Sequence, residues 1–292
     1  MTLIVPKRRI YVPREYQPLI TNHILKVKRC GIWARMGLGK TSAVLTAQDI
    51  LFLSGYETKP ALVLAPLRVA ASTWPEEVKK WDHLRHIELM PMIGDAPTRE
   101  RELIKALRAG NFSMFSINYE NIPWLMDFLK NQKGGFQWPF GTVIADESTK
   151  LKGFRSKQGA KRARLLASVA HKDCSRWINL TGTPSPNGLK DLWGQTWYLD
   201  AGERLGRTYQ SFSERWFYKS HDGYGLEPQP FAQQQIQDRL KDICISLDPA
   251  DYFDLEKPIE TVIEVDIPPK ARALYREMER QMYIEIEDDF KT

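Results

Sequence analysis

The segment ARMGLGKT, which begins at Ala34, contains residue types that bind phosphate groups. It matches the phosphate-loop pattern G-x-x-x-x-G-K-[ST], except that Ala34 replaces the first glycine. Gly37 and Gly39 allow backbone N–H groups to approach phosphate oxygens, Lys40 adds a positive charge, and Thr41 can ligate Mg²⁺. An ordinary glycine turn before a helix is the alternative. We predict a phosphate-binding loop, because the segment follows an apolar stretch and precedes a helical pattern.

Two carboxylates, Asp146 and Glu147, end the apolar stretch TVIAD and begin the next turn. Burial makes unpaired charge costly at such a place, and Mg²⁺ with its water would compensate it. We predict that Asp146 holds Mg²⁺ and that Glu147 orients or deprotonates a water, as phosphoryl transfer to water requires. Taken alone, such a pair is more often the charged start of a helix, so the catalytic interpretation depends on the phosphate loop.

Two threonines, Thr181 and Thr183, follow the apolar stretch RWINL. Their hydroxyl groups can bond both to carboxylates and to a neighbouring loop, which suits a coupling role between the nucleotide and another site. A plain turn before Pro184 would explain the same residues.

Short apolar stretches alternate with helical patterns in the first two thirds of the chain. Thr41–Leu53 has helical spacing and is followed by Gly55, and a second helical run begins with a Thr98 cap and ends at Gly110. This alternation predicts an α/β fold, with a parallel sheet covered by helices on both faces and ligands at the carboxyl ends of the strands. The predicted buried strands are GIWA (31–34), ALVLAP (61–66), FSMFSI (112–117), TVIAD (142–146) and RWINL (176–180).

The pattern changes after about residue 200. We assign residues 1–200 to the nucleotide-binding lobe and residues 201–258, which are rich in aromatic and basic side chains, to a mainly helical insertion outside the sheet. The alternating segment 259–267 predicts a strand, and 270–288 reads as a long charged helix. Residues 259–292 are therefore expected to form a final strand and a helical connector.

The composition indicates a globular protein that folds without disulfide bonds. The chain has 292 residues, 42% of them apolar, and nine tryptophans, which is enough for a large core. Its three cysteines form no C-x-x-C pair, which argues against a disulfide framework or a thiolate zinc site and fits a reducing cytoplasm. We expect neither a signal peptide nor a membrane span, because no apolar run approaches the ~18 residues that a span requires.

Basic residues are concentrated in one region of the sequence. The net charge is only +6, but seven lysines and arginines and no acidic residue lie between Ser148 and Leu166. Lys150, Lys152 and Arg155 are therefore candidates for contacts with a polyanion, although part of the run should be an ordinary solvated face. No base-reading module is visible, so binding should depend on backbone contacts and salt.

Taken together, the motifs resemble a known family. ARMGLGKT, ALVLAPLRVAASTWPEEVKKW, SINYEN, VIADESTKLKG and LTGTPSPN occur in the order and approximate spacing of motifs I, Ia, Ib, II and III of superfamily 2 helicases, and the set is similar to that of SNF2-type translocases. The resemblance implies a RecA-like lobe of the P-loop NTPase class that uses ATP and Mg²⁺. It places Gln17 on the adenine and the phosphates on Met36, Gly37, Leu38, Gly39, Lys40 and Thr41.

The resemblance also implies a second lobe. Members of the family fold as two RecA-like lobes with ATP between them and nucleic acid across the top. Motifs IV to VI, which include the arginine finger, do not occur in this sequence, so the second lobe is expected to be missing from the chain. The sequence also has DEST in place of DEAH, and Arg35 stands where the family usually has an acidic residue. We assign no role to these two departures.

The resemblance adds three candidates for contact with nucleic acid. Arg68 follows ALVLAP, and Asn118 and Tyr119 follow FSMFSI, at the positions where the family holds a strand's phosphates. Turn chemistry explains the same residues, and for Tyr119 packing is an equal alternative. The expected partner is DNA, double-stranded and bound with little sequence preference.

The predicted function is that of the ATP-binding lobe of a DNA-dependent ATPase of the helicase or translocase type. The isolated chain should be a poor ATP hydrolase. Two alternatives are a P-loop small-molecule phosphotransferase, against which LTGTP and the motif Ia match argue, and a non-catalytic nucleotide- or DNA-binding fragment. The expected location is the cytoplasm of a prokaryote or of a phage-infected cell.

Overall fold

The structure, a computed structural model, describes residues 7–110, 112–155, 161–220, 225–252, 268–269 and 271–278. The chain divides into two compact units, Met1–Phe253 and Asp254–Thr292, and the following paragraphs concern the first. In the second unit, the strand predicted at 259–267 lies outside the described residues. Part of the helix predicted at 270–288 is observed, because residues 271–278 are helical and exposed.

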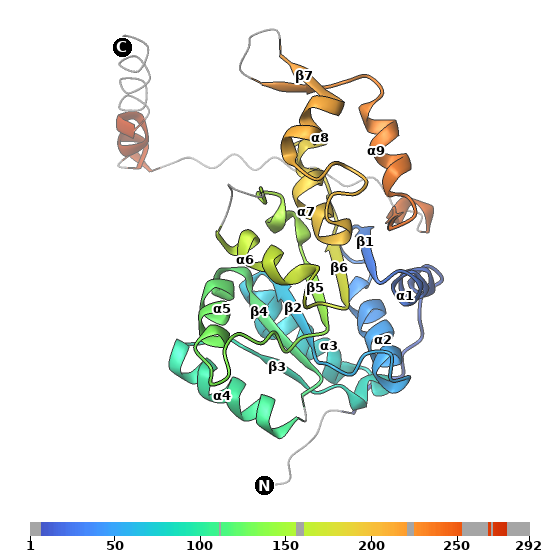
Figure 1. Ribbon diagram of the computed structural model, residues 1–292, viewed down its shortest axis with the longest axis vertical. Coiled ribbons are helices and arrows are strands. Elements are labelled where there is room, and N and C mark those ends of the chain that lie inside the picture. Colours follow the sequence, from blue (N-terminus) through green and yellow to red (C-terminus); the bar gives the residue numbers. More distant parts are fainter. Residues whose placement is uncertain are drawn as a thin grey trace. The chain divides into compact units, whose positions relative to one another are not determined.

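A seven-stranded sheet forms the centre of the first unit (Figure 1). Every pair of neighbouring strands in it is parallel. The five predicted strands are all present, each within two residues of its expected bounds. In spatial order the strands are β3 (Leu89–Pro91), β4 (Met114–Asn118), β2 (Ala61–Ala65), β5 (Thr142–Asp146), β6 (Arg176–Thr181), β1 (Arg29–Ala34) and β9 (Cys244–Leu247).

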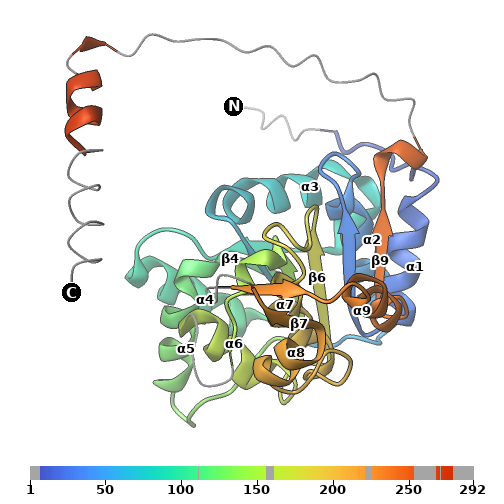
Figure 2. The same cartoon turned by 90° about the horizontal axis from the view of Figure 1, so that it is seen from above.

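Helices cover both faces of this sheet, which confirms the predicted α/β architecture (Figure 2). Alternate strand side chains point to opposite faces. In β5, for example, Val143 packs in the cluster that contains Leu62, and Ile144 packs in the cluster that contains Ile32. One face is covered by α1 (Gln17–Lys26), α2 (Lys40–Leu53) and α3 (Trp74–Lys80), and the other by α4 (Ala96–Ala109), α5 (Ile122–Lys130), α6 (Lys161–Ala170) and α7 (Lys190–Asp200).

Two local expectations need correction. Asp95, not Thr98, caps α4, because the Asp95 side chain accepts a hydrogen bond from the backbone N–H of Thr98. Strand β9 lies within the 201–258 stretch that was assigned to an insertion outside the sheet, and it pairs with β1 in the sheet. The short strand β3 was not predicted either.

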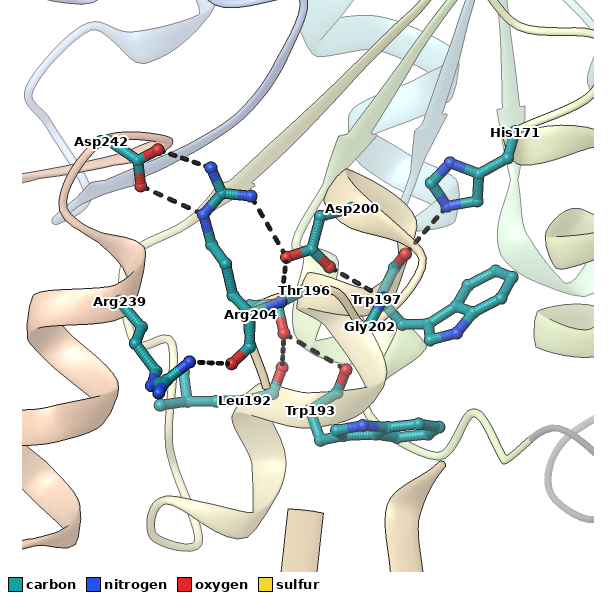
Figure 3. A network of polar contacts seen from close by, with 10 residues as sticks. All are labelled: His171, Leu192, Trp193, Thr196, Trp197, Asp200, Gly202, Arg204, Arg239 and Asp242. Atoms are coloured by element: carbon teal, nitrogen blue, oxygen red, sulfur yellow. Dashed lines mark hydrogen bonds and ion pairs between the residues drawn. The ribbon is translucent and has the colours of Figure 1, made fainter. Parts of the chain in front are cut away.

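The part of the insertion before β9 is mainly helical, as expected. It contains α8 (Tyr209–Trp216), α9 (Ala232–Leu240) and an antiparallel hairpin of β7 (Phe217–Lys219) and β8 (Leu226–Pro228). Figure 3 shows how polar contacts attach it to the end of α7. The guanidinium of Arg204 bonds to the carboxylates of Asp242 and Asp200, with its Nε 3.1 Å from Asp242 Oδ1, and Arg239 donates to the Arg204 carbonyl oxygen at 3.2 Å.

Within the described part of the chain, no helix combines the length and the apolar character that crossing a bilayer requires.

Candidate nucleotide site

The phosphate loop lies between the end of β1 and the start of α2, as the sequence predicts. Gly37 and Gly39 have φ angles of 82° and 63°, which side chains other than glycine rarely adopt. A Cβ atom on Gly39 would also collide with the amide nitrogen of the Gln17 side chain. The two glycines therefore permit the tight turn that opens α2 towards a ligand.

The Lys40 side chain folds back over this loop. Its ammonium donates to the carbonyl oxygens of Ala34 and of Arg35, the latter at 3.0 Å. Burial lowers the Lys40 pKa, and the nearby negative charges of Asp146 and Glu147 oppose that shift. The ammonium is thus held beside the two carboxylates by contacts that a phosphate group could replace.

Gln17 packs against the rear of the phosphate loop. Only 5% of the residue is exposed, and its Nε2 donates to the Gly39 carbonyl at 3.1 Å and to the Ser42 hydroxyl at 3.0 Å. Its Oε1 accepts from the Arg14 backbone N–H at 2.8 Å. The contact with adenine stays a prediction, and it would require Gln17 to exchange these bonds. In the structure the Gln17 side chain therefore stabilises the backbone of the phosphate loop at Gly39.

Asp146 lies at the carboxyl end of β5, partly buried. Its Oδ2 accepts a hydrogen bond from the indole Nε1 of Trp74 at 2.9 Å. Burial raises the Asp146 pKa, while the bond from Trp74 and the charge of Lys40 act in the other direction. Burial deprives the carboxylate of water, and a carboxylate in such a place is a suitable oxygen ligand for Mg²⁺. Thr41, the other predicted ligand, follows Lys40 at the start of α2, and its contact with the ion stays a prediction.

Glu147 is held by two hydroxyl groups. Its Oε1 accepts from Thr149 Oγ1 at 2.6 Å and from Thr181 Oγ1 at 3.1 Å, and Thr181 Oγ1 in turn accepts from the Thr183 backbone N–H at 3.1 Å. The backbone of Glu147 is left-handed, with φ 60° and ψ 58°. The predicted contact of the threonine segment with a carboxylate is present for Thr181, whereas Thr183 takes part through its backbone.

A cavity of about 670 Å³ opens beside Glu147. The phosphate loop and the segment after β6 approach each other closely on one side of it, because a Cβ on Gly182 would lie 3.4 Å from the Cα of Arg35. The cavity thus places Glu147 next to the loop that would hold phosphates. Its lining residues are Arg35, Met36, Glu147, Gly182, Thr183, Pro184, Ser185 and Pro186.

The structure changes the interpretation of two residues that were expected to touch nucleic acid. Tyr119 is fully buried and its hydroxyl donates to the Asp146 carbonyl at 2.9 Å. Asn118 is 6% exposed and bonds to Glu120 and Asn121, which is turn chemistry. Both side chains therefore have partners within the fold, which favours the packing and turn alternatives, and their contact with nucleic acid stays a prediction. Arg68 is exposed, as a phosphate contact requires.

The basic run is only partly available to a ligand. Lys152 forms an ion pair with Asp191 at 3.1 Å, and the Arg155 guanidinium lies 3.5 Å from the centre of the Tyr209 ring. Lys150 is exposed. Among the three predicted cations of this run, Lys150 is thus the strongest candidate for contact with phosphates.

One residue of the site was missed from the sequence. Trp74 was not among the predicted site residues, and it is fully buried. A buried indole still needs an acceptor for its N–H group, and that requirement was the available signal. The acceptor, Asp146, could not be identified before the fold was known.

Comparisons with known proteins identify relatives of the whole chain. The family model of the SNF2-related domain matches residues 24–290. Protein p41 of Acyrthosiphon pisum secondary endosymbiont phage 1 is 54% identical over 282 residues, covering 95% of this chain and 59% of that protein. Chromodomain-helicase-DNA-binding protein 7 of Gallus gallus is 26% identical over 285 residues, covering 90% of this chain and 8% of that protein. The chain therefore spans less than two thirds of these relatives.

Among solved structures, the Sulfolobus solfataricus SWI2/SNF2 ATPase core in complex with dsDNA matches with a TM-score of 0.61. The alignment has 21% sequence identity and covers 99% of this chain and 56% of that one. At this identity the match supports the fold alone. The family model covers most of the sequence, and the motif resemblance is confirmed: this chain belongs to the SNF2-related domain family.

Proposed function

We propose that this chain is the ATP-binding lobe of a DNA-dependent ATPase that couples hydrolysis to movement along DNA. The observation that carries the proposal is the position of Glu147. Its carboxylate is held by Thr149 and Thr181, and Glu147 lines a cavity together with Arg35 and Met36 of the phosphate loop. A carboxylate in that place can accept a proton from a water that attacks a terminal phosphate.

Each residue of the site has a distinct task in this proposal. Lys40 leaves the carbonyls of Ala34 and Arg35 and places its charge on the phosphates. Asp146 and Thr41 would hold Mg²⁺, which when bound neutralises charge on the phosphate oxygens. Glu147 orients the attacking water and takes its proton, while the hydroxyl of Thr181 keeps the carboxylate directed at the cavity.

Among the residues that line the cavity beside Glu147, Arg35 of the phosphate loop is the one arginine, so we propose that turnover also requires an arginine from a second RecA-like lobe. An arginine supplied across a cleft contributes about 10³ to 10⁵ in rate in related phosphoryl-transfer systems. The chain alone should therefore bind Mg²⁺–ATP and hydrolyse it at close to the background rate.

Duplex DNA is the proposed partner. The exposed side chains of Arg68 and Lys150 support it, and so does the similar fold of the Sulfolobus solfataricus SWI2/SNF2 ATPase core, which was solved in complex with dsDNA. We also propose a location in the cytoplasm of a prokaryote or of a phage-infected cell, since the three cysteines form no C-x-x-C pair and fit a reducing compartment.

Steady-state ATP turnover with and without duplex DNA tests the proposal. It is measured for the 292-residue chain alone and with a second RecA-like lobe of an SNF2 ATPase fused after Thr292 or added in trans. We expect DNA-stimulated turnover only with the second lobe, and its loss in Glu147→Gln. Brisk, DNA-stimulated hydrolysis by the chain alone would refute the requirement for a second lobe and make Arg35 the first candidate for the missing arginine.

A further inference from the structure

Two buried aromatic residues hold Asp146 from two different loops. The indole Nε1 of Trp74 donates to the carboxylate oxygen Oδ2 at 2.9 Å, and the Tyr119 hydroxyl donates to the backbone carbonyl of the same residue at 2.9 Å. Both rings are fully buried. Asp146 is therefore fixed at its side chain and at its main chain by groups that can only be moved together with their own loops.

These loops follow neighbouring strands on one side of β5. Trp74 begins α3, directly after a π-helical turn (Val69–Thr73) that follows β2. Tyr119 comes directly after β4 and begins a 3₁₀ turn. The two loops are joined to each other, because the Ser116 hydroxyl on β4 donates to the Ala70 carbonyl in the π-helical turn at 2.6 Å. Isolated π turns are uncommon and occur frequently at functional sites.

The Tyr119 hydroxyl also reaches the strained part of the backbone. It lies 3.5 Å from the Glu147 carbonyl oxygen as well as 2.9 Å from that of Asp146. Glu147, with φ 60°, is one of two non-glycine residues with positive φ in the described part of the chain. Such a conformation is energetically unfavourable for a residue other than glycine and persists only where the surroundings hold it. The phenol therefore helps to set the direction in which the Glu147 carboxylate points.

The exposed side of the same loops offers a contact for a polyanion. Arg68, the exposed residue that caps the π-helical turn, is the best remaining candidate for a phosphate contact after β2. A polyanion that binds Arg68 would contact the π-helical turn, and this turn leads directly into Trp74. Movement at the surface and movement of the Asp146 carboxylate are then connected by one short segment of chain, from Arg68 to the first residue of α3.

We propose that Trp74 and Tyr119 are positioning residues that couple duplex DNA, bound at the turn after β2, to the placement of Asp146 and Glu147. This rests on the proposed function, in which Asp146 holds Mg²⁺. Coupling between two ligands is reciprocal, so DNA should strengthen binding of the Mg²⁺–nucleotide by the factor by which the nucleotide strengthens binding of DNA. For typical coupled sites that factor is about 5 to 150.

The test measures that factor at equilibrium, without turnover. Binding of a fluorescent ADP to the full chain is titrated with and without Mg²⁺, and with and without a short duplex at saturation. The variants Trp74→Phe and Tyr119→Phe remove a donor group and keep an aromatic side chain. The matched controls are Trp177→Phe and Tyr198→Phe, because both control residues are fully buried and donate elsewhere, to Asn179 and to the Ala163 carbonyl.

We expect the wild type and both control variants to show the coupling factor with Mg²⁺ present. In Trp74→Phe and Tyr119→Phe it should fall towards one, while ADP affinity without Mg²⁺ stays within about twofold of wild type. If Trp74 and Tyr119 had only a structural role, their variants would bind ADP more weakly both with and without DNA. The coupling factor would then stay at the wild-type value, as it should in the control variants. If all four variants keep the wild-type factor, or if the wild type shows none, the coupling proposal is wrong.

Lys40→Ala separates this failure from failure of the proposed function. If that variant binds Mg²⁺–ADP as tightly as wild type, the nucleotide site itself has been misassigned. If it binds more weakly and no coupling is found, the site stands and only the roles of Trp74 and Tyr119 fall. Should Trp74→Phe not fold, Tyr119→Phe, which keeps the ring and loses one hydroxyl, carries the same test.

Discussion

The position of Lys40 sets the size of the effect expected when it is removed. A charge-assisted hydrogen bond contributes about 1.5–3 kcal/mol, which corresponds to about 10- to 150-fold in affinity. The free chain already satisfies the ammonium with two carbonyl oxygens, those of Ala34 and Arg35. The lysine must give up these contacts to reach a phosphate, so the net gain lies at the lower end of the range. We predict that Lys40→Ala weakens Mg²⁺–ATP binding by about tenfold.

Isothermal titration calorimetry with Mg²⁺–ATP measures this change, and circular dichroism checks that the variant is folded. Lys28→Ala is the matched control, because Lys28 is an exposed lysine that precedes the same strand β1. The control should bind as wild type. Unchanged affinity in Lys40→Ala would remove the nucleotide-site assignment. A loss of more than about a thousandfold would refute the argument that the lysine exchanges resting contacts for phosphate contacts.

Three further predictions concern the carboxylate, the basic surface and the packing beneath it. In a two-lobe protein, Glu147→Gln should keep nucleotide affinity and abolish ATP turnover, and normal turnover would exclude Glu147 as the base. The affinity for duplex DNA should fall steeply with salt, and Lys150→Ala should reduce the slope of log K against log salt by about 1, whatever the DNA sequence. Lys152→Ala should change the slope less, because Lys152 is paired with Asp191. If Lys150→Ala and the wild type have the same slope, Lys150 does not contact DNA phosphates. A Cβ atom on Gly194 would lie 2.7 Å from the Lys152 carbonyl carbon, so Gly194→Ala should lower the free energy of unfolding by about 1–3 kcal/mol. Calorimetry should then show a Tm lower by about 2–12 °C, and an unchanged Tm would show that α7 can shift freely.

The strands could be predicted because each is a short apolar run between polar helices. β2, with five consecutive buried residues, shows the pattern of a strand covered on both faces. β9 was missed since its sequence, CISL, is short and follows a helical, charged stretch. Its place is fixed by pairing with β1, and its neighbours in sequence carry no sign of that distant partner.

The site was predictable to the extent that its chemistry is local in sequence. Lys40, Asp146 and Glu147 were identified from short motifs, and Thr181 from its position after a strand. The role of Tyr119 depends on the direction of one side chain, which points inward to the Asp146 carbonyl and not outward to a ligand. Neighbouring residues in a turn can face either way, so the sequence alone could not decide between contact and packing.

The strand order has a consequence for synthesis of the protein on the ribosome. β1, which leads into the phosphate loop, is made early, but both of its neighbours, β6 and β9, are made late. At about 5–20 residues per second, roughly 10 to 40 s pass between emergence of β1 and of β9. Both edges of β1 are unpaired until β6 emerges, and the edge that pairs with β9 stays unpaired for the whole interval; unpaired edges are templates for association with other chains. Nascent chains that stall before β9 should therefore depend on chaperones more than the finished protein does.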